Sequence, residues 1–477
     1  MSDTNQTLFE RLNHWISNSA TIKLISIGIL ILLLLIPASM ITSLIQEREF
    51  TREAAIDEVS GKWSREQIIC GPILTIPYKQ YRQDQEGKLK EIIEYAHFLP
   101  ANLEVDGEIM PEQRYRGIYE VVVYNTQLEY KGHFNRPNFS DWDIPEEDIL
   151  WKDAFVSVGI TDMRGIKENM ELQWDESAHT FGPGMQTALM FAAQTQPALY
   201  DRFDLSDQDF PNKIANAGVS TRIPLSGNEE NLAYAFSLNL NGSKYLNFVP
   251  LGKETTVQLA SPWQNPSFDG AFLPDERAVE EDGFEAHWKI LHLNRNYPQQ
   301  WQGTAYNVND SVFGVNLLLP VDEYQKSIRS AKYAIMIIAL TFLLFFFVEV
   351  LNKKRIHPFQ YILVGLAICI FYTLLLSISE HTSFNFAYAV ASVVIIGMIT
   401  LYAQSIFKNN LLTRILGGML VVVYGFIFVI LQLQDFALLM GSIGLLIVLG
   451  IVMYLSRKVD WYNFKAVDTE GLSKANV

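Results

Sequence analysis

Glu380 and His381 stand side by side in a short polar turn between two long apolar runs, residues 362–377 and 384–402. A carboxylate and an imidazole can exchange protons near neutral pH, and ionisable groups at membrane depth often mark ion or substrate pathways. The same two residues also suit a polar turn at a membrane interface, where Glu380 would accept a hydrogen bond. Position alone favours the turn, and both interpretations stay open at the level of sequence.

The remaining residues form no recognisable catalytic motif. The eight histidines make no HExxH pair, and His287 and His292 are separated by five residues, which does not place them on one helix face. No G-x-S-x-G nucleophile motif occurs. Cys70 and Cys369 lie in segments of different character and predict neither a disulfide nor a zinc site. The sequence therefore predicts no catalytic residues, no metal, no cofactor and no enzymatic activity.

Two stretches combine aromatic, arginine, glycine and proline residues that could line a groove for a peptide or a glycan. Residues 261–274 place three aromatic rings among prolines, and residues 114–124 begin with two arginines that open a predicted strand. Tight turns and core aromatics use the same residue types, and this structural interpretation is the favoured one. The candidate functional residues taken from the sequence are Glu380, His381, Arg114, Arg116, Trp263 and Phe268.

Charge is unevenly distributed along the 477 residues. Residues 46–330 carry 25 Lys and Arg against 44 Asp and Glu, a formal charge of −19. The remainder carries 12 against 8, or +4, and the two parts give the chain its net −15. Because phosphate backbones are bound by basic patches, the acidic part excludes nucleic acid as a partner.

Hydropathy predicts six membrane spans in a one-plus-five arrangement. Residues 24–45 form the first, since about 20 apolar residues cross a bilayer core. The run is too long for a signal-peptide core, and we interpret it as a retained signal anchor. The other predicted spans are Ala334–Val350, Tyr361–Ile378, Phe384–Ala403, Ile415–Leu431 and Phe436–Leu455. Glu349, near the end of the second span, is expected to pair with Lys353 four residues later.

Basic residues in the short loops predict the orientation. Lys and Arg occur at 353–355, at 408 and 414, and at 457–458, whereas the turns 379–383 and 432–435 contain none. The positive-inside rule then places both termini in the cytoplasm. Residues 46–330 would lie in the periplasm of a bacterium with two membranes.

The expected fold is a polytopic α-helical membrane protein with a large β-rich, sandwich-like periplasmic domain inserted after the first span. The predicted divisions are a cytoplasmic amphipathic segment 1–23, transmembrane helix 24–45, periplasmic domain 46–330, five-helix transmembrane bundle 331–456 and cytoplasmic tail 457–477.

Local patterns give more detail within the predicted periplasmic domain. Residues 46–62 read as a polar continuation of the first helix, and apolar and polar residues alternate over 235–241 as in a half-buried strand. Asp-Gly and Asn-Gly pairs at 106–107, 241–242 and 269–270 predict turns.

A series of short motifs runs through the chain. They are Glu47-Arg48, Gln67 with 71–77, 114–119, 162–165, 241–243, 250–252, 263–268, 283–288, Asn294-Arg295 and 379–381. In this order, and together with one span, a large domain and five spans, they resemble the CreD family of inner-membrane proteins, also called cell envelope integrity proteins. The resemblance implies a role in envelope integrity, expression linked to a two-component system and altered tolerance to colicins and β-lactams. It implies no reaction and no catalytic residues.

Two classes of function follow. In the first, the β-rich domain binds a periplasmic protein or a cell-wall partner, and the spans anchor it in the lipid bilayer. In the second, the bundle is a transporter or a membrane-embedded enzyme that uses Glu380 and His381. The sequence leaves the oligomeric state open.

Overall fold

The computed structural model describes residues 20–83, 88–186, 217–227, 229–317, 323–352, 356–433 and 436–457. Contacts divide the chain into a helical unit, residues 1–52 with 321–477, and a β unit, residues 53–320. The domain limits predicted from the sequence are 46 and 330. The predicted amphipathic segment and the predicted tail lie almost entirely outside the described residues.

Helix α2, Ala20–Trp63, is a single helix of 44 residues. It confirms that the first span continues as a polar helix. Within the helical unit its buried residues recur at helical spacing, at Ile27, Leu30, Leu34 and Ile41, so one stripe packs on the bundle. The intervening large apolar residues are exposed, as expected for a helix that faces lipid.

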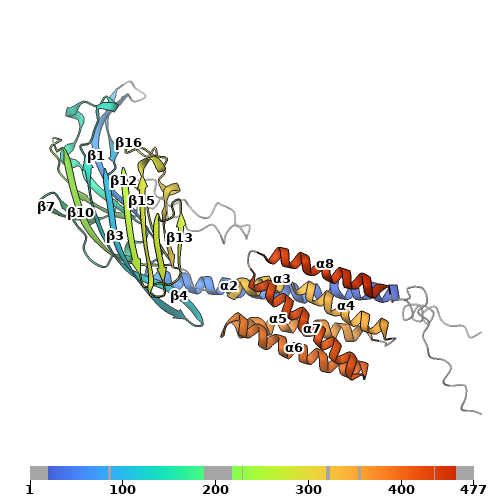
Figure 1. The fold of residues 1–477 in the computed structure, drawn as a ribbon. Helices are drawn as coiled ribbons and strands as arrows, with labels where there is room; N and C mark the ends of the chain where they lie inside the picture. The colour runs from blue at the N-terminus through green and yellow to red at the C-terminus, as the bar shows by residue number, and fades with distance from the viewer. Residues whose placement is uncertain are drawn as a thin grey trace, which may run out of the picture. The chain divides into compact units, whose positions relative to one another are not determined.

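The helical unit also contains a short helix α3, Glu323–Lys332, and five long apolar helices (Figure 1). These are α4 (Ala334–Leu351), α5 (Pro358–Ser379), α6 (Phe384–Phe407), α7 (Asn410–Gln432) and α8 (Ala437–Ser456). Among the described residues, six helices, α2 and α4 to α8, are long and apolar enough to cross a membrane. The six predicted spans are therefore confirmed, whereas α3 was not predicted.

The β unit consists of two sheets whose inner faces share one hydrophobic core (Figure 1). In the described residues, one sheet has nine strands. Their order is β13 (Pro266–Gly270), β17 (Phe313–Leu317), β11 (Tyr245–Phe248), β1 (Gln67–Gln83), β5 (Phe155–Ile160), β9 (Gly218–Arg222) and β8 (Gly182–Pro183), with β2 (Leu89–Phe98) between β1 and β16 (Gln300–Gln302).

The second sheet has eight strands in the described part of the chain. Their order is β14 (Glu276–Glu280), β15 (Gly283–Leu291), β12 (Glu254–Ser261), β3 (Asn102–Arg116), β4 (Tyr119–Asn135), β10 (Asn231–Ser243), β6 (Glu171–Trp174) and β7 (Ser177–Thr180). Short 3-10 helices occupy Ser140–Trp142, Glu146–Asp148, Trp151–Asp153, Met163–Gly165, His292–Asn294 and Asn309–Ser311. Most strand pairs are antiparallel, and β1–β11 and β3–β12 are parallel.

The alternation predicted over residues 235–241 is confirmed in β10, where Phe236, Leu238 and Leu240 enter the core. Two of the predicted turns are wrong, because 106–107 and 241–242 lie inside β3 and β10. A Cβ atom on Gly107 would lie 2.5 Å from a methyl group of Leu128. Glycine is used there to admit a neighbouring side chain, not to reverse the chain.

Residues 67–78 form the first part of β1 throughout. A register shift in the pairing of β1 with β5 falls between Cys70 and Ile73. A Cβ atom on Gly71 would lie 2.8 Å from Val158 Cα of β5, so this glycine allows the two strands to approach closely.

His97 of β2 is a buried titratable group in the β unit. Its side chain is 1% exposed, and its Nδ1 lies 2.9 Å from Thr75 Oγ1. Burial disfavours the charged imidazolium and lowers the pKa of His97 to about 4. The unfolded chain therefore takes up a proton at a higher pH than the folded chain does.

This difference predicts a pH-dependent stability. The stabilisation from neutral His97 is complete above pH 6.5 and is lost as the pH falls toward about 4. The unfolding free energy of the full chain in detergent can be measured with denaturant and tryptophan fluorescence. Between pH 6.5 and about 4 it should fall less in His97→Asn than in the wild type, by about 3 kcal/mol. The half-buried His287 provides the control, and an equal pH slope in His97→Asn and His287→Asn would refute the assignment.

Candidate functional site

Gln67, the first residue of β1, lies at a buried polar junction. Its Nε2 is 2.8 Å from Ser64 Oγ, 2.9 Å from the carbonyl oxygen of Asp162 and 3.0 Å from that of Asn241. Its Oε1 accepts from the N–H of Asp162 and from the Thr161 hydroxyl, each at 3.2 Å. One side chain thus joins three segments that are far apart in sequence.

Asp162 and Arg164 extend this junction to the end of α2. Arg164 donates from Nε and Nη2 to the two carboxylate oxygens of Asp162, at 2.8 and 2.6 Å. Its Nη1 donates to the carbonyl oxygen of Gly61 at 2.7 Å, which satisfies a carbonyl group in the last turn of the helix. Partial burial acts to raise the pKa of Asp162, but hydrogen bonds from Arg164 and from the Arg65 N–H lower it overall.

Arg114 and Arg116 end β3 instead of opening a strand, because a tight hairpin at residues 117–118 leads into β4. The Arg114 guanidinium lies 4.1 Å from the ring centroid of Trp63, a cation–π contact. Arg116 donates to both carboxylate oxygens of Glu58, each at 3.1 Å. The two candidate arginines therefore hold the last turns of α2 against the β unit.

Trp263 and Phe268 lie on the loop that leads into β13 and on β13 itself. The Phe268 ring meets the rings of Phe284 and Trp288 edge-on, with both centroid distances 5.7 Å. Trp263 is half-buried against the same core and donates from its indole N–H to the carbonyl oxygen of Asn265 at 3.1 Å. Both aromatic residues make core contacts within the β unit.

Glu380 and His381 occupy different environments. Glu380 caps the end of α5, and one of its carboxylate oxygens is 3.8 Å from Arg48 Nε of α2. The Glu380 side chain is 12% exposed, whereas His381 is exposed in the turn before α6. Their adjacency in sequence therefore does not place the two groups in one buried site.

A second ionic contact lies within the bundle. Glu349 of α4 is 1% exposed, and its carboxylate accepts from Lys23 Nζ of α2 at 2.5 Å. It also accepts from the N–H of Ile356 and the hydroxyl of Tyr361, each at 3.0 Å. The predicted partner, Lys353, lies outside the described residues. Three donors thus surround a buried carboxylate, as an ionisable group at membrane depth requires.

The two ionic contacts hold α2 near both ends of its apolar part. Lys23 and Arg48 are 25 residues apart, or roughly 37 Å along the helix axis, which exceeds the hydrocarbon thickness of a bilayer. Sequence analysis missed both pairings because the partners are hundreds of residues apart. The only available signal was the rarity of charged residues in the apolar segments.

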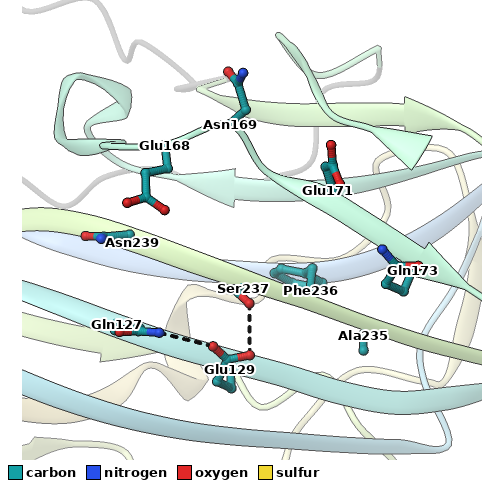
Figure 2. Close-up of a pocket in the computed structure, with 10 residues that line it drawn as sticks. All are labelled: Gln127, Glu129, Glu168, Asn169, Glu171, Gln173, Ala235, Phe236, Ser237 and Asn239. Atoms are coloured by element: carbon teal, nitrogen blue, oxygen red, sulfur yellow. Dashed lines mark hydrogen bonds between the residues drawn. The ribbon is translucent and has the colours of Figure 1, made fainter. Parts of the chain in front are cut away.

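The outer face of the eight-stranded sheet carries an open groove with a volume of 590 Å³ (Figure 2). Its lining residues come from β4, β6, β10 and the segment before β6. They are Gln127, Glu129, Glu168, Asn169, Glu171, Gln173, Ala235, Phe236, Ser237 and Asn239. Ser237 donates from Oγ to Glu129 at 2.9 Å. The lining has three carboxylates and no cationic side chain, so the groove suits a cationic or hydrogen-bonding partner.

Strand register assembles this groove. In the pairing of β4 with β10, Ser237 lies opposite Glu129 and Asn239 lies opposite Gln127. Each strand alone shows only alternating polar residues, so the pairing of these residues is not predictable from the sequence. Within the described ranges, no group of three His, Cys, Asp or Glu residues could hold a metal ion.

The Lys23–Glu349 contact predicts strong coupling between α2 and the bundle. Glu349→Ala should lower the unfolding free energy by about 3–5 kcal/mol, because it leaves Lys23 and two other donors without their acceptor. Lys23→Met combined with Glu349→Gln should be less destabilising than the sum of the two single changes. Chemical denaturation of the full chain in detergent measures the unfolding free energy of the wild type and of all four variants.

The surface pair formed by Lys62 and Glu58 provides the control for this cycle, with a distance of 2.6 Å. Lys62→Met should change the unfolding free energy by less than about 1 kcal/mol. Additive effects of the two changes at Lys23 and Glu349 would contradict the coupling.

Comparison with known proteins agrees with this architecture. The family model described as "Inner membrane protein CreD" matches residues 19–462. A relative from Escherichia coli (strain K12), also described as Inner membrane protein CreD, is 33% identical over 451 residues. The alignment covers 93% of this chain and 94% of the relative. The six apolar helices fit a multi-pass protein of the inner membrane, and the chain belongs to the CreD family of inner-membrane proteins.

Proposed function

We propose that this chain supports cell-envelope integrity as a membrane-anchored binding protein and that it does not catalyse a reaction. The family supports an inner-membrane setting. The division into a bundle and a large β unit supports separate anchoring and binding roles. With both termini in the cytoplasm, the β unit lies in the periplasm, where envelope proteins and the cell wall are its available partners.

The observation that carries the proposal is the groove on the eight-stranded sheet. It is open to solvent, and Glu129, Glu171 and Ser237 present hydrogen-bond acceptors from three different strands. Charge-assisted hydrogen bonds from an amine or guanidinium would satisfy these carboxylates. The expected partner is a periplasmic protein segment or a cell-wall peptide that carries amino groups.

A complementation experiment tests the groove. In a strain that lacks its own CreD-family protein, the wild-type chain should restore growth under detergent and β-lactam stress. Glu129→Gln with Glu171→Gln should not, because the loss of two charge-assisted contacts weakens binding by about tenfold or more. Immunoblots of membrane fractions establish that each variant is present at equal abundance.

The matched control removes two carboxylates from the edge of the same sheet. Glu276 and Glu280 are exposed on β14, outside the groove, so Glu276→Gln with Glu280→Gln should restore growth fully. Equal rescue by the groove variant and the edge variant would exclude the groove as the binding site.

The same assay addresses the polar turn between α5 and α6. His381→Ala and Glu380→Gln should each restore growth, because His381 is exposed and the Gln side chain keeps the size and hydrogen-bonding oxygen of Glu380. Loss of growth at normal abundance in either variant would oppose the proposal. It would instead favour a transporter or a membrane-embedded enzyme that uses this pair.

A further inference from the structure

Helix α3 buries two serines and carries three cations on the neighbouring part of its surface. Ser327 and Ser330 are buried, at 2% and 0% exposure, and these small side chains let α3 pack on the neighbouring helices α4 to α7. Lys326, Arg329 and Lys332 follow one another at intervals of three residues. At about 100° per residue they form a basic stripe about 120° wide, in which Lys326 borders the buried Ser330 and Lys332 lies on the side away from the two serines.

The basic stripe has no carboxylate partner among the side chains that the structure describes. No ion pair involves Lys326, Arg329 or Lys332 in that part of the chain. Lys326 Nζ lies 5.9 Å from the ring centroid of Phe384, at the start of α6, and Lys332 is exposed. By contrast, Lys23 and Arg48 of the same unit each contact a glutamate.

The position of the stripe is unusual for three cations that lack a carboxylate partner among the described side chains. Lys332 is two residues before the first residue of α4, and all three cations lie within eight residues of that membrane-spanning helix. Because α3 follows the β unit in the chain, these residues lie on the side of the membrane to which the β unit is exported. Cations so close to a span normally oppose export. An anionic group at the membrane surface would offset this disadvantage.

We propose that the basic stripe of α3 binds the phosphate headgroup of an anionic membrane lipid. Lipid phosphates lie at the level where a helix leads into a span, and several closely spaced Lys and Arg residues are the usual means of attracting them. The packing of Ser327 and Ser330 fixes the helix, so the three cations are displayed together before the lipid arrives. In the orientation proposed above, the lipid belongs to the periplasmic leaflet.

The test is a titration of the detergent-purified full chain with short-chain phosphatidylglycerol. Binding is followed by the thermal midpoint, and native mass spectrometry detects the bound lipid. Removal of each cation should weaken binding roughly fivefold, so Lys326→Gln, Arg329→Gln and Lys332→Gln together should weaken it roughly a hundredfold. A matched variant, Lys131→Gln, Arg222→Gln and Lys289→Gln, removes the same number of each cation from ion-paired positions in the β unit and should bind normally.

The single variant Lys332→Gln separates a loss of binding from a loss of folding, because Lys332 is exposed and its replacement should not disturb the fold. It should weaken binding roughly fivefold without changing the thermal midpoint of the lipid-free protein. Equal binding of phosphatidylglycerol by the wild type and the triple α3 variant would overturn the proposal. So would equally tight binding of short-chain phosphatidylcholine. Displacement of the lipid by inorganic phosphate at similar concentrations would assign the site to free phosphate instead.

Discussion

The polar junction around Gln67 and Asp162 is the constraint on which the β unit depends. The Gln67 amide bonds to three segments of the chain, and Arg164 neutralises Asp162 while it bonds to the end of α2. Gln67 and Asp162 are buried, so each would be costly to the fold if it lost its hydrogen-bond partners. The junction therefore fixes, at one point, the end of a helix, the start of the central strand β1 and the course of β10.

The helical bundle has a different constraint, because a bilayer contains no water that could form hydrogen bonds with its polar groups. Its described helices are almost entirely apolar, and the buried Glu349 is surrounded by three donors. This contact ties α2, the first helix that the structure describes, to helices that follow the β unit in the chain. The exposed apolar residues of α8 show a different solution, since lipid itself can cover them. In the proposed function, the bundle is the anchor and the β unit binds the partner.

Sequence patterns predicted the helices and strands better than they predicted the contacts of the candidate functional residues. The six spans are predicted by hydropathy, and the strand at 235–241 is predicted by its alternation of apolar and polar residues. Both signals lie within one continuous segment of the sequence. The Asp-Gly and Asn-Gly pairs at 106–107 and 241–242 wrongly predicted turns, because glycine occurs both in turns and where strands pack closely. Only the neighbouring side chains in the folded sheet distinguish the two cases. The contacts of Arg114 with Trp63 and of Arg116 with Glu58 join distant segments, so residue spacing does not predict them.

The sequence by itself determined the family, the one-plus-five order of the spans and the β-rich character of the intervening region. These properties depend on local composition and on the order of short motifs. The tertiary structure decided which residues meet: Glu349 with Lys23, Glu380 with Arg48, and Glu129 with Ser237. Such contacts depend on helix packing and strand register between distant segments, and a register shift of one residue would turn the Glu129 side chain to the other face of its sheet.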